Sequence, residues 1–501
     1  MAVNFKQFLS GTDIRGTAVE TENSPISLTD EVCYAISAAF GSWLSDKTGK
    51  PADELVIAVG HDSRISADRV CAAIFSGLTA SGITVLDCGL SSTPAMFMIT
   101  KQIYSDSGKN TDGAIQITAS HHPFDRNGMK FFTGDGGLDA ADVAIILKLA
   151  ATGTKPLSGR GKVIACDFMA EYTSILREII KKGVNAENYD KPLYGFHIVV
   201  DAGNGAGGFF ATEVLERLGA DIEGSQFLEP DGLFPNHIPN PEDETAMRYI
   251  KNATLSNKAH LGVIFDTDVD RAGCVAADGE EINRNRLVAL AAALAIEICP
   301  GGTIVTDSTT SDGLSAFIEQ TLGGRHHRFK RGYKNVINEA VRLNKDGTIA
   351  PLAAETSGHV AFADNYFLDD GAYLIVRIII KMAQLAAENK TLNDLLAKLD
   401  EPAQSVEYRY NILGDDWRST GLGALERFAE LAAEKGWEPY PDNHEGYRVM
   451  VPEFKGWLLL RMSVHDPVMP LNIESNIAGG VEMIMKQLEP FFLAEPNLKK
   501  K

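Results

Sequence analysis

The sequence predicts a multidomain α/β protein that ends in a separate α+β domain. Short apolar runs rich in β-branched residues recur along the chain, and helix-like stretches lie between them, which is typical of α/β domains with parallel or mixed sheets. The last hundred residues have a different pattern of strands and helices. At about 100–200 residues per domain, a chain of 501 residues corresponds to three or four domains.

The predicted strands of the α/β part do not alternate with polar residues, as expected of strands that are buried on both faces. They lie at residues 54–60, 82–89, 112–120, 195–203, 260–268 and 302–308. Helices are predicted at residues 66–82, 209–220 and 285–299. In the last domain we expect strands at 405–413, 447–454 and 456–464, helices at 422–436 and 474–492, and a frayed tail at 497–501.

Composition excludes several classes of partner. The net charge is −20, and the basic residues are scattered, so we expect neither nucleic-acid nor membrane binding. An anionic ligand must therefore meet a local basic pocket. The six cysteines form no C-x-x-C pair, which indicates reduced core cysteines. With no signal-peptide pattern and no apolar run long enough to span a membrane, we expect a cytoplasmic protein.

Polar residues cluster where predicted strands end. Ligands of α/β sheets gather at the carboxyl ends of strands. Three such units recur, one ending near Ser120, one spanning residues 201–270 and one spanning residues 307–359. They suggest a diverged three-fold repeat.

The stretch "FDTDVDR" carries the sharpest signal. Asp266, Asp268 and Asp270 follow a buried strand, and three carboxylates that converge there require a cation. Hard oxygen ligands suit Mg²⁺ or Ca²⁺. An EF-hand fails because Arg271 stands where that loop needs glycine, whereas an aspartyl-nucleophile phosphatase stays open as an alternative.

Two other motifs leave alternatives open. "VVDAGNGAGGFF" fits G-x-G-x-x-G through Gly203, Gly205 and Gly208, which is typical of a dinucleotide site or, more simply, of a tight strand–helix turn. "TASHHP" places Ser120 beside two histidines, so this serine is a nucleophile, a phosphate carrier or a helix cap.

Further side chains suit a phosphorylated sugar. In "AAETSGHVAF", Glu355, Ser357 and His359 offer the carboxylate and hydroxyl groups that sugar recognition requires. Basic residues stand beside glycines or strand ends, where together they suggest phosphate contacts: Arg15, Arg64, Lys130, Lys334 and Arg461.

Taken in order, these motifs resemble the α-D-phosphohexomutases, the phosphoglucomutase/phosphomannomutase superfamily, over nearly the whole chain. "TASHHP" resembles the phosphoserine loop, "DTDVDR" the metal loop, "AETSGH" the sugar-specificity loop and "RMSVHDP" the last phosphate-binding loop. "PDGLFPNHIPNPEDE" and "VVDAGNGAGG" are further hallmarks. The resemblance makes the glycine turn structural and removes the dinucleotide hypothesis.

The resemblance implies four domains around a central cleft, three related α/β mixed-sheet domains and a C-terminal α+β domain. We place domain I with the phosphoserine loop at residues 1–165, domain II with the metal loop at 166–286, domain III with the specificity loop at 287–402 and domain IV with the phosphate loop at 403–501.

The implied activity interconverts hexose 1-phosphate and hexose 6-phosphate of glucose, mannose or both, through phosphoserine and a hexose 1,6-bisphosphate that is intermediate and activator. Mg²⁺ is held by Asp266, Asp268, Asp270 and phosphorylated Ser120. By resemblance, Arg15, Lys130 and His359 transfer protons or stabilise charge, and Arg271 and His121 support the centre. Glu355 and Ser357 hold sugar hydroxyls, and the distal phosphate binds Arg461, Ser463, Val464 and His465. The partner is a small phosphosugar, and the chain is a monomer or a dimer.

Several residues depart from the family pattern. His122 replaces the usual asparagine after "SH", His61 stands where arginine is common, and Ala354 replaces a glycine. In the last loop Asp466 replaces glutamate, and Pro470 stands where a second arginine is common, so one bidentate phosphate contact is lost.

Three alternatives follow from these motifs. A phosphoglucosamine mutase usually has glutamine where Thr356 stands. A metal-dependent sugar phosphatase would use Asp266 as nucleophile and would survive Ser120→Ala. A non-catalytic sugar-phosphate-binding relative would bind without turnover.

Overall fold

The structure is a computed structural model that describes residues 3–22, 24–101, 103–104, 109–153, 161–441, 443–463 and 466–501. It forms two compact units. The first comprises Met1–Leu287 and Ser357–Asp394, and the second comprises Val288–Thr356 and Leu395–Lys501. Two helices cross the boundaries between units, namely α7 (Arg284–Ile298) and α11 (Leu392–Leu396).

The first unit begins with an eight-stranded mixed sheet in the order β1-β2-β8-β7-β3-β4-β10, with β9 beside β8. Strands β7, β3, β4 and β10 pair in parallel, and β1, β2, β8 and β7 pair antiparallel. The bounds are β1 (Leu9–Ser10), β2 (Asp13–Thr17), β3 (Val56–His61), β4 (Thr84–Leu90), β7 (Gly113–Ile117), β8 (Arg126–Thr133), β9 (Gly136–Gly137) and β10 (Lys162–Ala165). A separate pair joins β5 (Ile103–Tyr104) to β6 (Lys109–Asn110).

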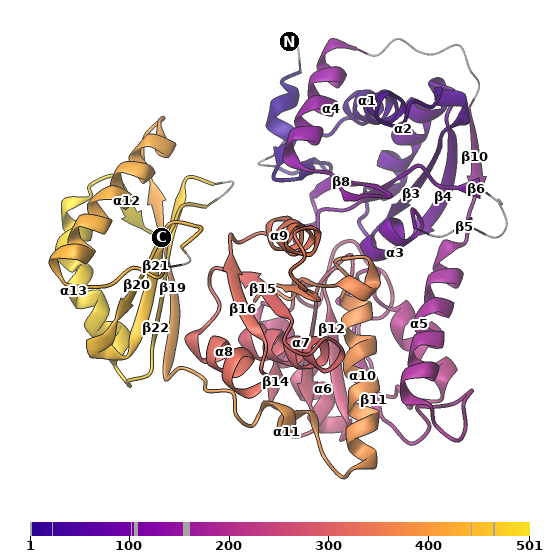
Figure 1. The fold of residues 1–501 in the computed structure, drawn as a ribbon. Coiled ribbons are helices and arrows are strands. Elements are labelled where there is room, and N and C mark those ends of the chain that lie inside the picture. Colours follow the sequence, from indigo (N-terminus) through magenta and orange to yellow (C-terminus); the bar gives the residue numbers. More distant parts are fainter. Residues whose placement is uncertain are drawn as a thin grey trace. The chain divides into compact units, whose positions relative to one another are not determined.

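Helices cover both faces of this sheet. Figure 1 shows α1 (Asp30–Thr48), α2 (Ala67–Ala80) and α4 (Ala140–Thr152) on one face and α3 (Thr93–Met98) on the other. Short 3-10 turns η1 (Phe5–Phe8) and η2 (Ala52–Glu54) complete this part. Helix α1 begins where Thr29 Oγ1 accepts from the Val32 amide at 3.4 Å and ends at Gly49, with φ of 68°; these are favourable caps.

A second, four-stranded mixed sheet of the first unit has the order β11-β12-β13-β14. Its strands are β11 (Ile198–Asp201), β12 (Leu261–Phe265), β13 (Ala272–Ala276) and β14 (Glu281–Ile282). The first unit also contains α5 (Phe168–Val184), α6 (Glu244–Asn257), α10 (Gly371–Ala387), β18 (Val360–Phe362) and η6 (Ala363–Asn365). The helix predicted at 209–220 forms as a π-helical segment, η3 (Phe210–Leu215), followed by a 3-10 turn, η4 (Glu216–Leu218).

The second unit contains three parallel strands in the order β16-β15-β17. They are β15 (Thr303–Asp307), β16 (Arg325–Phe329) and β17 (Leu352–Ala354). The helices of this part are α8 (Asp312–Ala316), the π-helical η5 (Phe317–Thr321) and α9 (Tyr333–Lys345).

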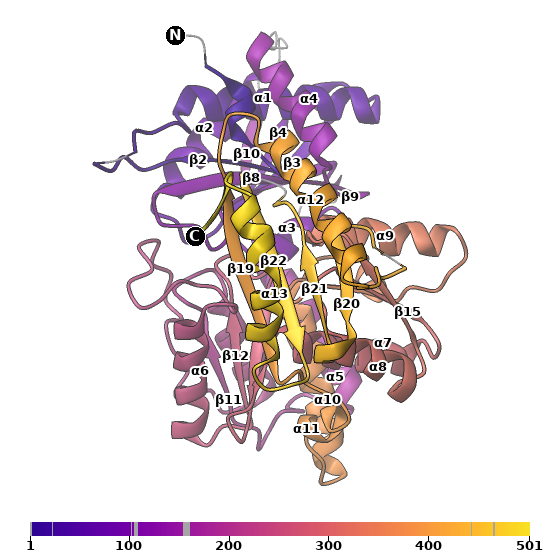
Figure 2. The same ribbon diagram turned by 90° about the vertical axis from the view of Figure 1, so that its left-hand side faces the viewer.

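The C-terminal part of the second unit is an antiparallel sheet in the order β20-β21-β22-β19-β23. Helices α12 (Trp417–Glu434) and α13 (Gly480–Ala494) cover one of its faces, as Figures 1 and 2 show together. Apolar side chains of both layers, among them Phe428, Leu458 and Ile484, form its core. The strands are β19 (Gln404–Ile412), β20 (Tyr447–Val451), β21 (Gly456–Leu460), β22 (Val468–Ser475) and β23 (Leu498–Lys500), with a 3-10 turn η7 (Pro452–Phe454).

The expected frayed tail is wrong. Strand β23 pairs with β19, the Lys501 amide donates to the Arg409 carbonyl at 2.8 Å, and Leu498 is buried. Strand β22 was not among the predicted strands, because Pro470 lies inside it and the polar residues Asn472, Glu474 and Ser475 follow.

The predicted fold class is confirmed in its layers: mixed α/β sheets are followed by a C-terminal α+β sheet domain. All six cysteines lie in the described part of the chain, where they form no disulfide, and five of them are buried, as predicted. Within the described part of the chain, no helix combines the length and the apolar character needed to cross a membrane.

Candidate active site

Ser120 lies in the loop that follows β7, at the carboxyl end of a buried strand. Its backbone φ is 49°, a left-handed conformation that costs a non-glycine residue free energy unless its surroundings hold it. The Ser120 amide donates to Thr118 Oγ1 at 2.9 Å, and Thr118 Oγ1 donates to Asp62 Oδ2 at 2.7 Å. Thr118 and Asp62 therefore fix the backbone of the serine.

Arg64 lies beneath the same loop, and the predicted contact of its side chain with a substrate stays a prediction. The side chain is completely buried. Its five N–H groups donate to Asp62 Oδ2 at 3.2 Å and to the carbonyls of Ser120, His122, Pro123 and Arg126 at 2.5, 2.7, 2.7 and 2.9 Å. A guanidinium has five donors, so the loop takes all of them. Arg64 therefore positions the loop.

The three aspartates that follow β12 converge as predicted. Asp266, Asp268 and Asp270 are buried, and one carboxylate oxygen of each lies within 4.8 Å of the others. Burial, together with the charge of Asp270, raises the pKa of Asp266 to about 8. Burial would also raise the pKa of Asp270, but the charge of Lys130 holds it well below its usual value. The three carboxylates therefore repel one another, and cations must balance them.

Two predicted basic residues supply part of that balance. Lys130 Nζ donates to Asp268 Oδ2 at 2.9 Å and also to Asp270 Oδ2. Arg271 donates from Nε and Nη2 to Asp266 Oδ2 at 3.1 and 3.0 Å. Both cations are buried, so these ion pairs act in a poorly screened environment.

Ser120 Oγ joins this cluster directly. It donates to Asp266 Oδ2 at 3.0 Å and accepts from Arg271 Nη2 at 2.9 Å. Arg271 Nη2 also lies 2.6 Å from His121 Nδ1, which is therefore the acceptor. Partial loss of water around the ring and the charge of Arg271 lower the pKa of His121, so this imidazole is neutral. The predicted residues 120, 121, 266 and 271 thus form one hydrogen-bonded group.

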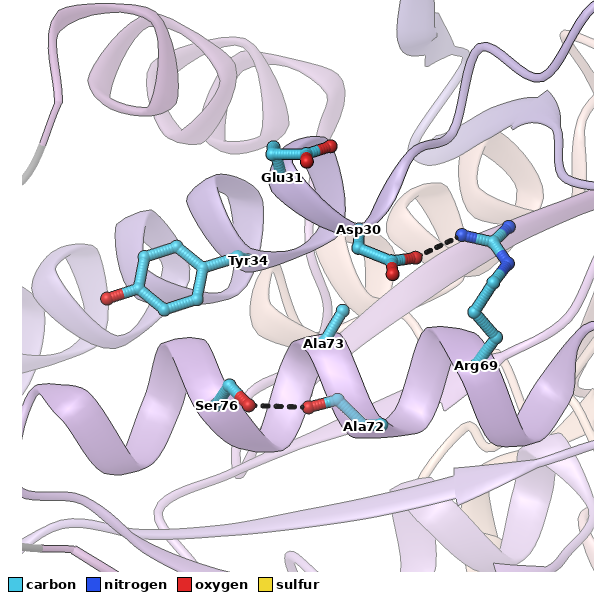
Figure 3. Close-up of a pocket in the computed structure, with 7 residues that line it drawn as sticks. All are labelled: Asp30, Glu31, Tyr34, Arg69, Ala72, Ala73 and Ser76. Atoms are coloured by element: carbon cyan, nitrogen blue, oxygen red, sulfur yellow. Dashed lines mark hydrogen bonds and ion pairs between the residues drawn. The ribbon is translucent and has the colours of Figure 1, made fainter.

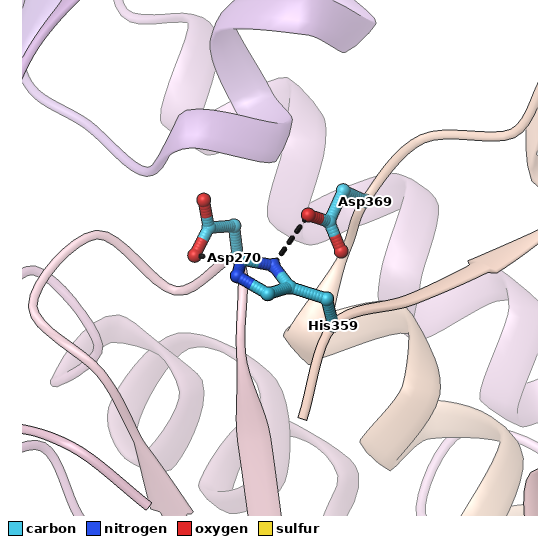
Figure 4. A group of neighbouring side chains, drawn as sticks. All are labelled: Asp270, His359 and Asp369. Carbon is cyan, nitrogen blue, oxygen red and sulfur yellow. Dashed lines mark hydrogen bonds and ion pairs between the residues drawn. The ribbon is translucent and has the colours of Figure 1, made fainter. Parts of the chain in front are cut away.

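His359 lies beside Asp270 and Asp369, as Figure 4 shows. Its Nδ1 lies 2.5 Å from Asp369 Oδ2 and 3.9 Å from Asp270 Oδ1. Burial opposes the charged imidazole, but the two carboxylates raise the pKa of His359 to about 9. His359 is therefore an imidazolium at neutral pH, between two aspartates.

Two residues of the cluster were missed by sequence reasoning. Asp369 orients His359, and Thr93 donates to Asp268 from both its amide, at 2.8 Å to the carbonyl, and its hydroxyl, at 2.5 Å to Oδ2. Neither stands in a recognisable motif. Only its position at the start of α3, after a predicted strand, could have drawn attention to Thr93.

The donor set of this cluster fits a divalent cation. Asp268 Oδ1 and Asp270 Oδ1 are buried and have no hydrogen-bond partner among the described residues. Lys130 and Arg271 occupy other oxygens of the three carboxyl groups, so these two oxygens are available to a cation. Hard carboxylate oxygens are the ligands of Mg²⁺ and Ca²⁺.

Arg15 lies on β2 beside the serine loop. It donates to Asp13 Oδ2 at 2.7 Å and to the carbonyl of Thr118, two residues before Ser120. Its side chain is buried. The structure therefore brings Arg15 to the loop backbone, and a contact with a reacting group stays a prediction.

The predicted sugar and phosphate ligands lie mainly in the second unit. Glu355 follows β17 and accepts from the Gly332 amide at 2.6 Å. Arg461 directly follows β21 (Gly456–Leu460), is buried, and has Nη1 3.5 Å from Glu445 Oε1. Lys334 lies in the first turn of α9, and Ser463 follows Arg461 in the loop. Ser357 belongs to the first unit, and Val464 and His465 lie outside the described residues.

The departures from the family pattern have local structural roles. The ring of His122 stacks on that of His121 with centroids 5.3 Å apart. His61 Nδ1 lies 2.7 Å from the Asp62 carbonyl, and Ala354 is buried at the end of β17. Pro470 lies in β22 opposite Arg409 of β19.

A surface hollow on the first unit lies apart from these residues. Figure 3 shows it between α1 and α2, where Asp30 pairs with Arg69 at 2.5 Å. It has a volume of about 460 Å³ and is lined by Asp30, Glu31, Tyr34, Arg69, Ala72, Ala73 and Ser76. It contains none of the predicted site residues.

The arrangement around Ser120 suits phosphoryl transfer. Such chemistry needs an oxygen nucleophile or carrier, cations for the phosphoryl charge and a metal site, with little covalent work by other groups. The serine hydroxyl, the aspartates, Lys130 and Arg271 provide these. The fold and the site together define a protein of the phosphoryl-transfer class.

Comparison with known proteins identifies the family. Models of the phosphoglucomutase/phosphomannomutase α/β/α domains I, II and III match residues 6–155, 170–279 and 283–402. The phosphomannomutase/phosphoglucomutase of Pseudomonas aeruginosa is 30% identical over 94% of this chain and 92% of its own length. A phosphoglucomutase of Neisseria meningitidis is 28% identical over 99% of both chains.

A solved structure agrees with these relatives. The crystal structure of a phosphoglucomutase/phosphomannomutase family protein from Burkholderia thailandensis superposes with a TM-score of 0.81 at 27% identity, covering 99% of each chain. The chain belongs to the phosphoglucomutase/phosphomannomutase family.

Proposed function

We propose that the chain is a Mg²⁺-dependent phosphohexomutase that interconverts hexose 1-phosphate and hexose 6-phosphate, with glucose, mannose or both as the sugar. The observation that carries the proposal is the position of Ser120 Oγ, 3.0 Å from Asp266 Oδ2 in the aspartate cluster and 2.9 Å from Arg271 Nη2. The relatives named phosphoglucomutase and phosphomannomutase/phosphoglucomutase support it.

In the proposed cycle, Ser120 carries a phosphoryl group. The bond from phosphorus to Ser120 Oγ breaks, a bond to a free hydroxyl of the hexose phosphate forms, and the hydroxyl proton passes to a base. The resulting hexose 1,6-bisphosphate turns over and returns its other phosphoryl group to Ser120, which releases the isomeric monophosphate. We assign the proton transfers and charge stabilisation to Arg15, Lys130 and His359.

The residues around the serine supply the electrostatics of this step. Mg²⁺ bound by Asp266, Asp268, Asp270 and a phosphoserine oxygen would neutralise charge on the transferring group. Arg271 donates to Ser120 Oγ at 2.9 Å, where negative charge develops as the phosphoryl group leaves. A donor preorganised at that oxygen favours the transition state over the ground state.

The remaining assignments concern the rest of the substrate. Glu355 and Ser357 hold the sugar hydroxyls, and Lys334 contacts a phosphate. The distal phosphate binds Arg461, Ser463 and the backbone of Val464 and His465. We further propose a monomer or a dimer in the cytoplasm, whose reducing conditions suit six cysteines that form no disulfide.

Two measurements test the activity. Coupled assays with glucose 1-phosphate, mannose 1-phosphate and glucosamine 1-phosphate should show turnover of a neutral sugar when Mg²⁺ and a hexose 1,6-bisphosphate are present. Intact mass and phosphopeptide mapping should find phosphate on Ser120 that is lost in excess hexose phosphate. No turnover of any of the three sugars would refute the proposal.

The alternatives give different results in the same experiments. Preference for glucosamine 1-phosphate would indicate a phosphoglucosamine mutase. Release of inorganic phosphate that survives Ser120→Ala would indicate a phosphatase with Asp266 as nucleophile, although Asp266 Oδ2 already accepts from Ser120 and Arg271. Binding without turnover would indicate a non-catalytic relative.

A further inference from the structure

Three arginines of the second unit converge on two glutamates at the end of β21. Glu407 Oε2 lies 3.8 Å from Arg331 Nη1 and 3.9 Å from Arg461 Nη2, and Glu407 Oε1 accepts from Arg409 Nε at 2.7 Å. Glu445 lies 3.5 Å from Arg461 Nη1. We call Arg331, Arg409, Arg461, Glu407 and Glu445 the arginine cluster.

Convergence of like charges needs a reason in a protein of net charge −20. Arg461 has only 6% of its side chain exposed, and its Nε has no hydrogen-bond partner among the described residues. Burial and the neighbouring charge of Arg331 lower the pKa of Arg461, against the opposing effect of Glu445. A guanidinium held this way is costly unless an anion satisfies it.

The backbone shows why the cluster forms at this place. The Arg461 amide donates to the Pro470 carbonyl at 3.1 Å, and Pro470 is opposite Arg409 in the β19–β22 pair. Residues directly opposite each other in an antiparallel pair present their side chains on the same face. Arg409 therefore lies on the same face as Pro470 and beside it, where the family pattern commonly has a second arginine. Arg331 comes from the segment between β16 and α9, where its amide donates to Glu445 Oε2 at 2.9 Å.

We propose that Arg331 and Arg409 join Arg461 in binding the distal phosphate of the hexose phosphate, and that Glu407 and Glu445 are counterions which the phosphate displaces. The proposal rests on the proposed function for the identity of the ligand. Guanidinium groups bind phosphate oxygens in a bidentate manner, and a phosphate dianion carries more charge than either carboxylate. Two arginines outside the last loop thereby provide the contact that Pro470 cannot.

A counterion role and a structural role of Glu407 predict opposite changes in phosphate affinity when its charge is removed. The Glu407 side chain is 24% exposed, so it can turn to solvent when phosphate binds. If Glu407 competes with phosphate, removing its charge must strengthen phosphate binding. If Glu407 only holds the arginines in place, removing its charge must weaken it.

Calorimetric titration with glucose 6-phosphate, mannose 6-phosphate and the unphosphorylated sugars tests the proposal in the full-length protein. We expect Arg331→Met to weaken hexose phosphate binding about 10-fold, the size of a charged hydrogen bond. Arg409→Gln, at a side chain that is 58% exposed, should weaken it about threefold, and Glu407→Gln should strengthen it about threefold. Binding of the unphosphorylated sugars should not change.

A matched control lies in the same domain. Arg427 pairs with Glu495 and is 52% exposed, so Arg427→Gln should leave the affinity unchanged. Arg331→Lys should recover part of the loss, and equal melting temperatures of the variants would exclude misfolding. Unchanged affinity in both Arg331→Met and Arg409→Gln, or weaker binding in Glu407→Gln, would overturn the proposal.

The proposed function can fail separately. Hexose phosphate binding that depends on these arginines, without turnover, would refute the mutase activity and support the arginine cluster. Turnover together with a hexose phosphate affinity that the arginine substitutions leave unchanged would support the activity and refute the proposed role of the arginine cluster. A wild-type protein that neither binds nor converts either hexose phosphate would refute both.

Discussion

Replacing Arg64 by lysine separates a loop-positioning role from a substrate-binding role. The guanidinium donates five hydrogen bonds, four to carbonyls of residues 120–126 and one to Asp62. Lysine keeps the charge but has three donors, so at least two of the five acceptors lose the donor that Arg64 provides. A hydrogen bond lost in a partly buried place costs about 0.5–1.5 kcal/mol, and we therefore expect a loss of about 1–3 kcal/mol. Arg64→Met would cost more, because Asp62 would remain as an unpaired buried charge.

The assay needs both stability and kinetics. The midpoint of the denaturant transition that contains domain I should fall, and backbone amides of residues 118–126 should exchange hydrogen faster. Because Ser120 Oγ must stay within hydrogen-bonding distance of Arg271 and Asp266, a small shift of the loop misplaces the phosphoryl group. We expect kcat to fall about 100-fold, with KM for the hexose phosphate changed by less than about threefold.

The control is Arg217→Lys, because Arg217 is 64% exposed and pairs with Glu213 one helical turn away. That variant should stay within about 0.5 kcal/mol of the wild type. If Arg64→Lys left the transition midpoint unchanged while KM rose about 10-fold at constant kcat, Arg64 would be a substrate contact, as its place in the sequence suggested, and the reasoning from its five donors would be refuted.

Three further predictions concern the metal, pH and the C-terminus. Chelation should abolish turnover until Mg²⁺ is restored, and Asp268→Asn should raise the Mg²⁺ concentration for half-maximal activity at least about 10-fold, whereas an unchanged Mg²⁺ requirement would exclude Asp268 as a ligand. The pKa of His359 is raised from 6.5 to about 9 in the folded protein, so its charge stabilises the fold below pH 6.5, and this contribution is lost as pH rises through 9. In His359→Gln the melting temperature should fall less steeply across that pH range than in the wild type. An equally steep fall would contradict the assignment. Removing residues 498–501 should destabilise the C-terminal domain by about 2 kcal/mol, since Leu498 is buried and β23 pairs with β19, and an unchanged unfolding midpoint would mean that the tail is frayed after all.

The Ser120 loop and the aspartate loop could be predicted because the reactive residues of each loop are close neighbours in the sequence. Asp266, Asp268 and Asp270 follow one buried strand, so their convergence could be inferred from charge repulsion alone. Asp369 and Thr93 could not be found this way. Asp369 is 10 residues from His359 in the sequence, and Thr93 is 175 residues from Asp268. Neither pair forms a contiguous motif, and only the fold brings the two partners into contact.

The tail shows a different failure, in which composition concealed a strand. Three consecutive lysines at residues 499–501 look like a solvated end. Strand β23 is, however, the edge of its sheet, and lysines on an edge strand prevent pairing with another chain. Lys500 Nζ lies 4.2 Å from the ring centroid of Tyr408, so one of these charges also makes a cation–π contact. The same residues that suggested fraying are those that an edge strand favours.

The arginines mark the limit of sequence reasoning most clearly, because a guanidinium binds backbone carbonyls and phosphate oxygens with the same geometry. Only a count of occupied donors separates the two uses. Arg64 has all five donors on protein acceptors and is completely buried. Arg461 is almost as buried, yet its Nε has no hydrogen-bond partner in the described part of the chain, and its nearest carboxylates lie at 3.5 and 3.9 Å. Two arginines that the sequence placed in one class therefore differ in kind: Arg64 stabilises a loop, and Arg461 has donors available for an anion.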